Sequence, residues 1–180
     1  MKPVTMWTGQ QKIVLETIEK TGEYYVKKEF IDQKYQETSW IFKEAYSFFA
    51  RKASEIVAKP EQAESPVWLF KDRRWVFQNE NTVLMKLTIP DDEIVLFDMN
   101  KWNKILNLSY LGDAQSFEEK LKRQGITDPL EIFSKPFYPL LKKEVADSWT
   151  DVFQTDDTEE QYIQGAVWRL KRDWIEEINP

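Results

Sequence analysis

The sequence predicts an α+β fold: a small, mainly antiparallel sheet packed against helices, in a single domain that spans residues 1–180. Three observations lead to this prediction. The chain of 180 residues suits one domain and is long enough to bury roughly two-thirds of its unfolded surface. Its composition, 42% hydrophobic and 31% charged, is that of a folded globule. Apolar residues alternate in the middle of the chain and recur at helical spacing on both sides.

Two helices are predicted before the central strands. Apolar residues recur at helical spacing within residues 9–22, and Gly22 stands where a left-handed C-terminal cap is expected. The second helix covers residues 39–58, with Ser39 as its N-cap. A short strand at 24–26 is predicted between them.

The predicted strands follow an exposed loop at 59–66, which contains two prolines. Two short strands are expected at 67–70 and 75–77, joined by a charged turn. The clearest alternation covers residues 83–89, and a turn at Pro90-Asp91-Asp92 leads into a further strand at 93–98. We expect these last two strands to form a hairpin at the centre of the fold.

Helix signals dominate the remaining sequence. Ser116 and Glu119 have the spacing of a capping box, with Gly125 as the cap at the other end of that helix. Asp128 followed by Pro129 predicts another helix start.

The last segment allows two interpretations. Thr158 and Gln161 have the spacing of a capping box, and apolar residues within 163–178 fall on one helical face. Residues 162–168 also alternate as a strand would. Helix and strand therefore both remain open for residues 162–170.

The chain contains no histidine and no cysteine. A Ser-His-Asp triad, a Cys-His dyad and metal centres held by these two residue types are therefore excluded. The spacing of its five glycines also matches neither the Rossmann fingerprint nor the P-loop. The sequence indicates no particular cofactor, and whether the chain is an enzyme stays open.

The net charge of -6 argues against a broad surface for nucleic acid. The first twenty residues lack the apolar core of a signal peptide, and no stretch approaches the roughly 18 apolar residues of a membrane span. We therefore expect a cytoplasmic protein that binds neither nucleic acid nor membrane.

An acidic run at 144–160 contains no Lys or Arg. Clustered carboxylates suit a hard cation, but the glycine and the regular spacing of an EF-hand loop are missing. Acids also stabilise helix N-termini and keep a surface solvated. We favour capping and solvation here and predict no metal site.

A small anionic ligand is the one binding chemistry to which particular residues point. Arg73 and Arg74 can grip a phosphate or carboxylate, and the neighbouring Trp75 offers a stacking face, as a nucleotide or dinucleotide requires. We expect at least five of the eight tryptophans to fill the core. Trp102 differs, because polar residues surround it just after a strand. The predicted ligand site comprises Arg73, Arg74, Trp102, Asp98, Asn100 and Asn103; ordinary solvated arginines and a half-buried Trp are the alternative interpretation.

Several motifs, in their order along the chain, resemble a family of small bacterial proteins of unknown function. The motifs are Trp7-Thr8, Pro66-Val67-Trp68, Ile89-Pro90 through Val95-Leu96-Phe97-Asp98, Trp102, Leu106-Asn107, Ser148-Trp149, Val152-Phe153, and Gln164 with Trp168. The resemblance implies a bacterial cytoplasmic protein without an assigned activity.

A more distant similarity is to the ADP-ribosyltransferase-like fold. It implies a basic or histidine residue on an early strand, a hydroxyl or aromatic residue on a central strand, and a catalytic Glu on a late strand. Here the early position is Trp7-Thr8 and the late one is Gln164-Gly165-Ala166, so the basic residue and the Glu are missing. We therefore favour a non-catalytic module that binds a small anionic ligand or a protein partner. An NAD- or nucleotide-using transferase is the alternative.

Overall fold

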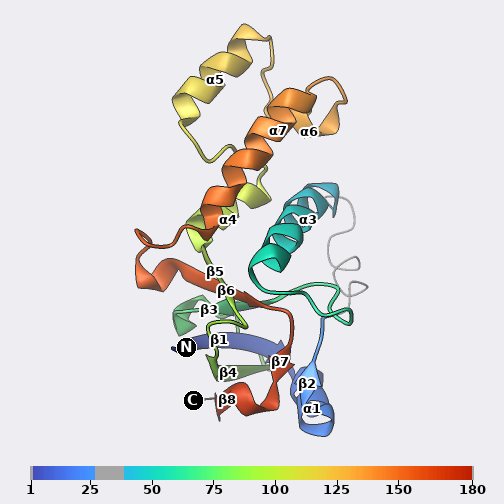
Figure 1. Ribbon diagram of the computed structural model, residues 1–180, viewed down its shortest axis with the longest axis vertical. Helices are drawn as coiled ribbons and strands as arrows, with labels where there is room; N and C mark the ends of the chain where they lie inside the picture. The colour runs from blue at the N-terminus through green and yellow to red at the C-terminus, as the bar shows by residue number, and fades with distance from the viewer. Residues whose placement is uncertain (1, 27–38, 180) are drawn as a thin grey trace.

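An antiparallel sheet of six strands forms one part of the computed structural model, and helices extend from it to the opposite end (Figure 1). The structure describes residues 2–26 and 39–179. Its combination of helices with an antiparallel sheet confirms the predicted α+β class. The strand order is β5-β6-β3-β1-β4-β8, and β2 pairs separately with β7.

The strands are β1 (Val4–Gln11), β2 (Glu23–Tyr24), β3 (Val67–Phe70), β4 (Thr82–Ile89), β5 (Val95–Asp98), β6 (Ile163–Val167), β7 (Leu170–Lys171) and β8 (Ile175–Ile178). The α-helices are α1 (Lys12–Thr21), α3 (Ser39–Ile56), α4 (Met99–Leu106), α5 (Ala114–Arg123), α6 (Glu131–Ser134) and α7 (Pro139–Ser148). Four short 3-10 turns are η1 (Arg73–Trp75), η2 (Trp149–Phe153), η3 (Glu160–Tyr162) and η4 (Arg172–Trp174).

The middle of the sheet is unevenly paired. β1 pairs with β4 along its whole length, from Val4 opposite Ile89 to Gln11 opposite Thr82. Its register with β3 consists of one residue pair, Trp7 opposite Phe70. The sheet is therefore two halves, β1-β4-β8 and β3-β6-β5, that join at this pair.

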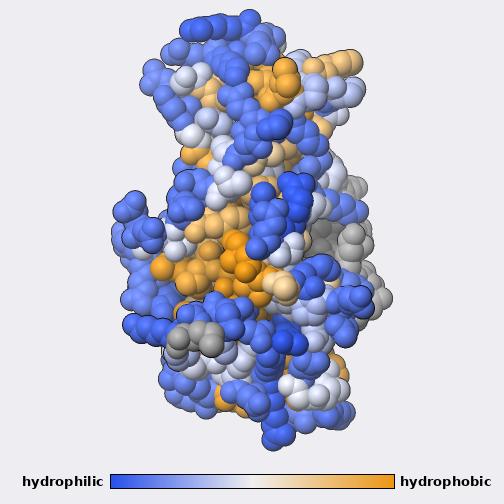
Figure 2. Space-filling view, in the orientation of Figure 1, coloured by the Kyte–Doolittle hydropathy of each residue, from blue (hydrophilic) through white to orange (hydrophobic). Residues whose placement is uncertain are grey.

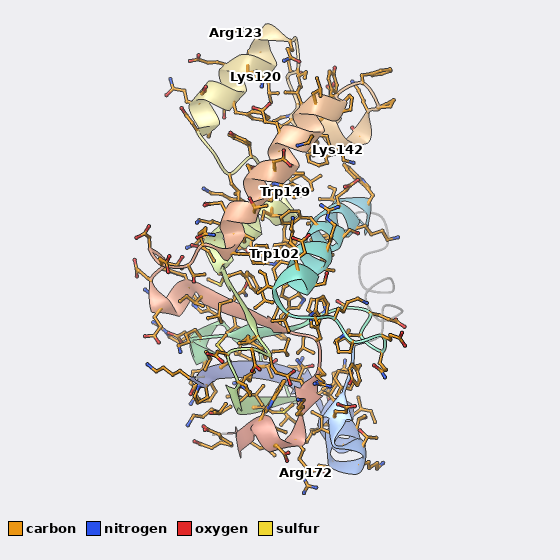
Figure 3. The ribbon with its side chains drawn as sticks, in the orientation of Figure 1. Trp102, Lys120, Arg123, Lys142, Trp149 and Arg172 are labelled. Atoms are coloured by element: carbon orange, nitrogen blue, oxygen red, sulfur yellow. The ribbon has the colours of Figure 1, made fainter. Side chains whose placement is uncertain are left out.

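Aromatic side chains fill the core between the sheet and the helices. Phe49 of α3 contacts Trp68, Phe97 and Trp102, with ring centroids 4.9 to 5.1 Å apart. Trp102 and Trp149 both lie between α3 and the neighbouring helices (Figure 3). Trp102, Trp149, Trp168 and Trp174 are buried, and Trp68 packs against the same core. Five tryptophans thus contribute to the core, and Trp102 is one of them.

The first helix begins later than the sequence suggested. Gly9 belongs to β1 because its backbone pairs with Leu84 of β4, and α1 starts at Lys12. The helix ends as predicted, with Gly22 in the left-handed conformation (φ 85°) and its N–H donating to the carbonyl of Ile18. The second predicted helix is α3, while the side chain of its proposed N-cap, Ser39, lies outside the described ones.

The expected strand at 75–77 is wrong. Asp72 accepts a hydrogen bond from the backbone N–H of Arg74 and caps the short turn η1. This local bond competes with strand pairing, so residues 67–70 form a strand and 75–77 do not.

The expected central hairpin is also wrong, although both of its strands exist. β4 pairs with β1 and β8 on its two edges, whereas β5 pairs with β6 alone among the described strands. Because β4 has no free edge, the turn after Pro90 carries the chain to the other half of the sheet. Glu93 in this connection accepts hydrogen bonds from Arg169 and Lys171, which fixes it against β7.

The C-terminal segment is extended, so the helix predicted at 163–178 is wrong and the strand alternative is confirmed. β6 lies between β3 and β5 and pairs with both. The backbone hydrogen bonds of this pairing outweigh the helical spacing of the apolar side chains. Thr158 caps no helix; its hydroxyl donates to Asp98 instead.

The caps of the intervening helices differ in part from prediction. Asp113, not Ser116, caps α5 by accepting from two backbone N–H groups. Gly125 follows this helix in the left-handed conformation, as predicted. Asp128 accepts from the N–H of Leu130, but the helix it precedes, α6, has only four residues.

The acidic run contributes ion pairs to the surface. Glu144 pairs with Lys120, Asp147 with Lys143, and Asp151 with Lys101. Within the described residues, no group of three or more acids is arranged to hold a metal ion. No helix in the same part of the chain is both long and apolar enough to cross a membrane.

We predict that Glu93→Gln destabilises the protein near neutral pH by about 1 to 3 kcal/mol. Burial raises the pKa of Glu93, but the hydrogen bonds from Lys171 and Arg169 outweigh it and hold the pKa below the ordinary 4.5. The carboxylate therefore stabilises the fold above that value, and the contribution is lost as the pH falls through the lowered folded pKa. Urea unfolding from pH 7 to pH 3 measures this loss. Glu61→Gln, in an exposed loop, is the control, and equal effects of the two variants would contradict the prediction.

Candidate functional site

A cleft of about 400 Å³ lies where β3 departs from β1, and we call it the strand cleft. Beyond Trp7 the backbones of the two strands no longer pair, and the cleft opens between them. The cleft is lined by Thr8, Gly9, Gln10, Val26, Tyr46, Ser65, Pro66, Val67, Trp68, Phe70, Trp75, Val76, Phe77 and Thr82.

The polar side chains of the strand cleft come from several elements: Thr8 and Gln10 from β1, Tyr46 from α3, Thr82 from β4, and Ser65 from the residues before β3. Gln10 donates its side-chain N–H to the Thr8 hydroxyl, which in turn donates to the carbonyl of Trp68 across the cleft. Thr8 and Ser65 are both buried. The side-chain carbonyl oxygen of Gln10 takes no part in these two hydrogen bonds and can accept another one. The lining thus offers hydrogen-bonding groups without any charged side chain.

Aromatic rings form much of the wall of the strand cleft. Trp68 and Tyr46 pack edge to face, with centroids 5.6 Å apart. Trp75 and Phe77 remain 44% and 76% exposed, although both rings are apolar. Rings that stay accessible beside a cleft provide a flat surface for stacking.

Gly9 determines how closely the 76–77 segment approaches β1. A Cβ atom at this position would lie 2.8 Å from the carbonyl oxygen of Phe77 and 2.9 Å from Val76 Cγ1. Only a residue without a side chain therefore lets this wall of the cleft rest on the strand.

A second cleft, the basic cleft, lies on the other side of η1 and has a volume of about 600 Å³. It is lined by Trp7, Lys71, Asp72, Arg73, Arg74, Glu159, Glu160 and Gln161. Its three basic and three acidic side chains balance in charge. The two clefts lie side by side because Trp75 lines the strand cleft and donates its indole N–H to the carbonyl of Gln161.

The three basic side chains of the basic cleft differ in whether they form an ion pair. Arg74 forms two hydrogen bonds to one oxygen of Asp72, which raises the pKa of the guanidinium and lowers that of the carboxyl. Lys71 lies 3.3 Å from Glu160. Arg73 forms no ion pair within the described residues, and its guanidinium lies 5.6 Å from the centre of the Trp7 ring. Among the basic side chains of this cleft, Arg73 is thus the one that can bind an anion without breaking an ion pair.

Gln164 of β6 has a buried side-chain oxygen with no hydrogen-bond partner among the described residues. It lies opposite Phe70, a residue of the strand cleft. The resemblance to ADP-ribosyltransferases expects a Glu at this place, and the neutral amide brings no negative charge to it.

The structure divides the residues of the predicted ligand site. Arg73 and Arg74 line the basic cleft. Trp102 is buried and stacks against Trp68, with centroids 5.4 Å apart. Asp98 is buried too and caps α4 by accepting from the N–H of Lys101. Asn100 and Asn103 are exposed on the same helix. Arg73 and Trp102 therefore share none of the clefts described.

Sequence reasoning placed none of the strand cleft's polar residues in the site. Thr8 and Trp68 were noted only within motifs, because a strand residue and its partner sixty positions away give no local signal. The two motifs lie close together in the structure, since Thr8 bonds to the carbonyl of Trp68 and both motifs contribute residues to the strand cleft.

Comparison with known families shows that the model of a domain of unknown function (DUF3841) matches residues 5–176. The chain belongs to this family. The motifs had predicted membership of a family without an assigned function, and this prediction is confirmed. No curated protein and no solved structure matches the chain. The match covers β1 through β8 except for the ends of these two strands, so both clefts lie within the DUF3841 domain.

We predict that Gly9→Ala destabilises this DUF3841 domain by about 1 to 3 kcal/mol, because the added methyl group collides with Phe77 and Val76. Urea unfolding followed by tryptophan fluorescence measures the change. Gln11→Ala, at an exposed position of the same strand, is the control. Unchanged stability of Gly9→Ala would show that the 76–77 segment does not rest on β1.

Proposed function

We propose that the chain is a small-molecule-binding module whose ligand combines a flat, uncharged ring with an anionic group, as a nucleotide does. One observation carries this proposal: an uncharged aromatic cleft and a charged cleft meet at Trp75. The ring would lie in the strand cleft, and the anionic group would reach Arg73.

The strand cleft supports the position of the ring. Its volume of about 400 Å³ falls in the range of small-molecule sites, which combine apolar walls with a few polar groups. Trp75 provides a stacking face, and the Gln10 amide and the Ser65 hydroxyl provide hydrogen bonds to the edge of a heterocycle.

The pairing in the basic cleft supports the position of the anion. Arg74 is paired with Asp72, and Lys71 is paired with Glu160. Neither cation can therefore bind an anion without breaking its ion pair. Arg73 has only the Trp7 ring beside it, and a phosphate would gain a charge-assisted hydrogen bond there. A monophosphate, rather than a di- or triphosphate, suits this single available cation.

Binding without catalysis is favoured over an NAD- or nucleotide-using transferase. The chemistry implied by the resemblance uses a carboxylate to stabilise a positively charged sugar, and Gln164 supplies a neutral amide at that position. We further propose that the protein acts in the bacterial cytoplasm, from the motifs and composition discussed above. The sequence also suggested that the chain binds a protein partner instead of a small molecule.

Isothermal titration with AMP, adenosine and inorganic phosphate tests the proposal. We expect AMP to bind more tightly than adenosine, and phosphate alone to bind weakly. Arg73→Gln is expected to weaken AMP about tenfold, which is about 1.4 kcal/mol, and to leave adenosine unchanged. Trp75→Leu is expected to weaken both ligands, because it removes the stacking face.

Arg123→Gln is the matched control, since this arginine lies at the far helical end on α5 (Figure 3). Equal affinities for AMP and adenosine, or equal losses in Arg73→Gln and Arg123→Gln, would contradict the role of Arg73. Absence of saturable binding by AMP and adenosine would contradict the proposal as a whole.

A further inference from the structure

A cavity of about 500 Å³ lies in the helical end of the molecule, separate from both clefts. It is lined by residues of α3, α4, α5, α6 and α7 and of the segment that follows α4, and it shares no lining residue with the strand cleft or the basic cleft. Figure 2 shows hydrophobic side chains at the surface of this end, surrounded by hydrophilic ones.

The larger part of the cavity wall is apolar. Leu108, Phe117, Leu121, Ile132 and Val145 line it, and each is less than 10% exposed. They come from four different elements, so the cavity lies at their junction and not within one helix pair. A cavity whose apolar walls are accompanied by polar groups such as Asn107 and Ser109 favours an occupant with an apolar body and a polar group.

Hydrogen bonds to α7 and η2 hold the 108–111 wall in place. The indole N–H of Trp149 donates to the carbonyl of Ser109 at 2.8 Å, and Ser148 Oγ accepts from the N–H of Leu111 at 3.1 Å. Tyr110 stacks on Phe117, with centroids 4.4 Å apart and planes at 18°. These contacts restrict the movement of the 108–111 wall, which lowers the entropy cost of binding a ligand against it.

The charges at the rim indicate an uncharged ligand. Lys104 and Glu118 are the charged lining residues, both exposed, and neither forms an ion pair within the described part of the chain. An anionic head group would be attracted by Lys104 and repelled by Glu118, and a cationic one would experience the reverse. A neutral polar group avoids both repulsions and can still form a hydrogen bond at the rim.

We propose that this cavity binds an uncharged molecule with an alkyl or small aromatic body and one neutral polar group, such as a medium-chain alcohol. The alkyl body lies among Leu121, Ile132 and Val145, and the hydroxyl group faces the rim with Lys104 and Glu118. The site is independent of the nucleotide-like ligand of the strand cleft.

Titration with 1-octanol, followed by the methyl NMR signals of the protein, tests this inference. We expect saturable shifts of the Leu108, Leu121, Ile132 and Val145 methyl groups, and at least fivefold weaker binding of octanoate and octylamine. Ala114→Phe adds a ring at an exposed lining position and is expected to weaken 1-octanol about tenfold.

Leu140→Ala separates a specific site from general adhesion to apolar surface. Leu140 is 81% exposed and does not line the cavity, so this variant should bind 1-octanol as the parent does. Trp75→Leu should also bind it normally, whatever the outcome for AMP. The inference is overturned if no lining methyl group shifts, if octanoate or octylamine binds as tightly as 1-octanol, or if Ala114→Phe binds it unchanged.

Discussion

The single pairing of Trp7 with Phe70 is the constraint on which the rest of the structure depends. It joins two half-sheets that are otherwise complete, since β1 pairs fully with β4 and β3 pairs fully with β6. Because the strands separate beyond this pair, their backbones form no further ladder bonds with each other. The Thr8 hydroxyl crosses the gap to the carbonyl of Trp68, and the resulting space is the strand cleft.

The packing around this junction explains why a gap persists in the folded protein. Trp68 is held from behind by Phe49 and Trp102, so β3 cannot move toward β1 without breaking the aromatic core. On the other side, the backbone of Phe77 and the side chain of Val76 pack closely against Gly9 of β1. Core packing therefore positions one wall of the cleft, and a close backbone approach positions the other.

The sequence was sufficient for the elements with local signals and insufficient for those set by distant partners. Gly22 and the alternation of β4 marked a helix end and a strand because their causes lie within a few residues. The placement of β5 beside β6 depends on a strand nearly seventy residues later, so a neighbouring turn suggested a hairpin instead. Arg73 was identified by its residue type, whereas its partner Trp7 was not, since only the fold brings them together.

Nuclear Overhauser contacts between backbone protons of β1 and its two neighbours test the central claim most directly. The account predicts a continuous ladder of contacts between β1 and β4, from Val4–Ile89 to Gln11–Thr82. Between β1 and β3 it predicts contacts around Trp7 and Phe70 alone. A ladder that continues from β1 into the start of β3 would close the strand cleft and contradict the account.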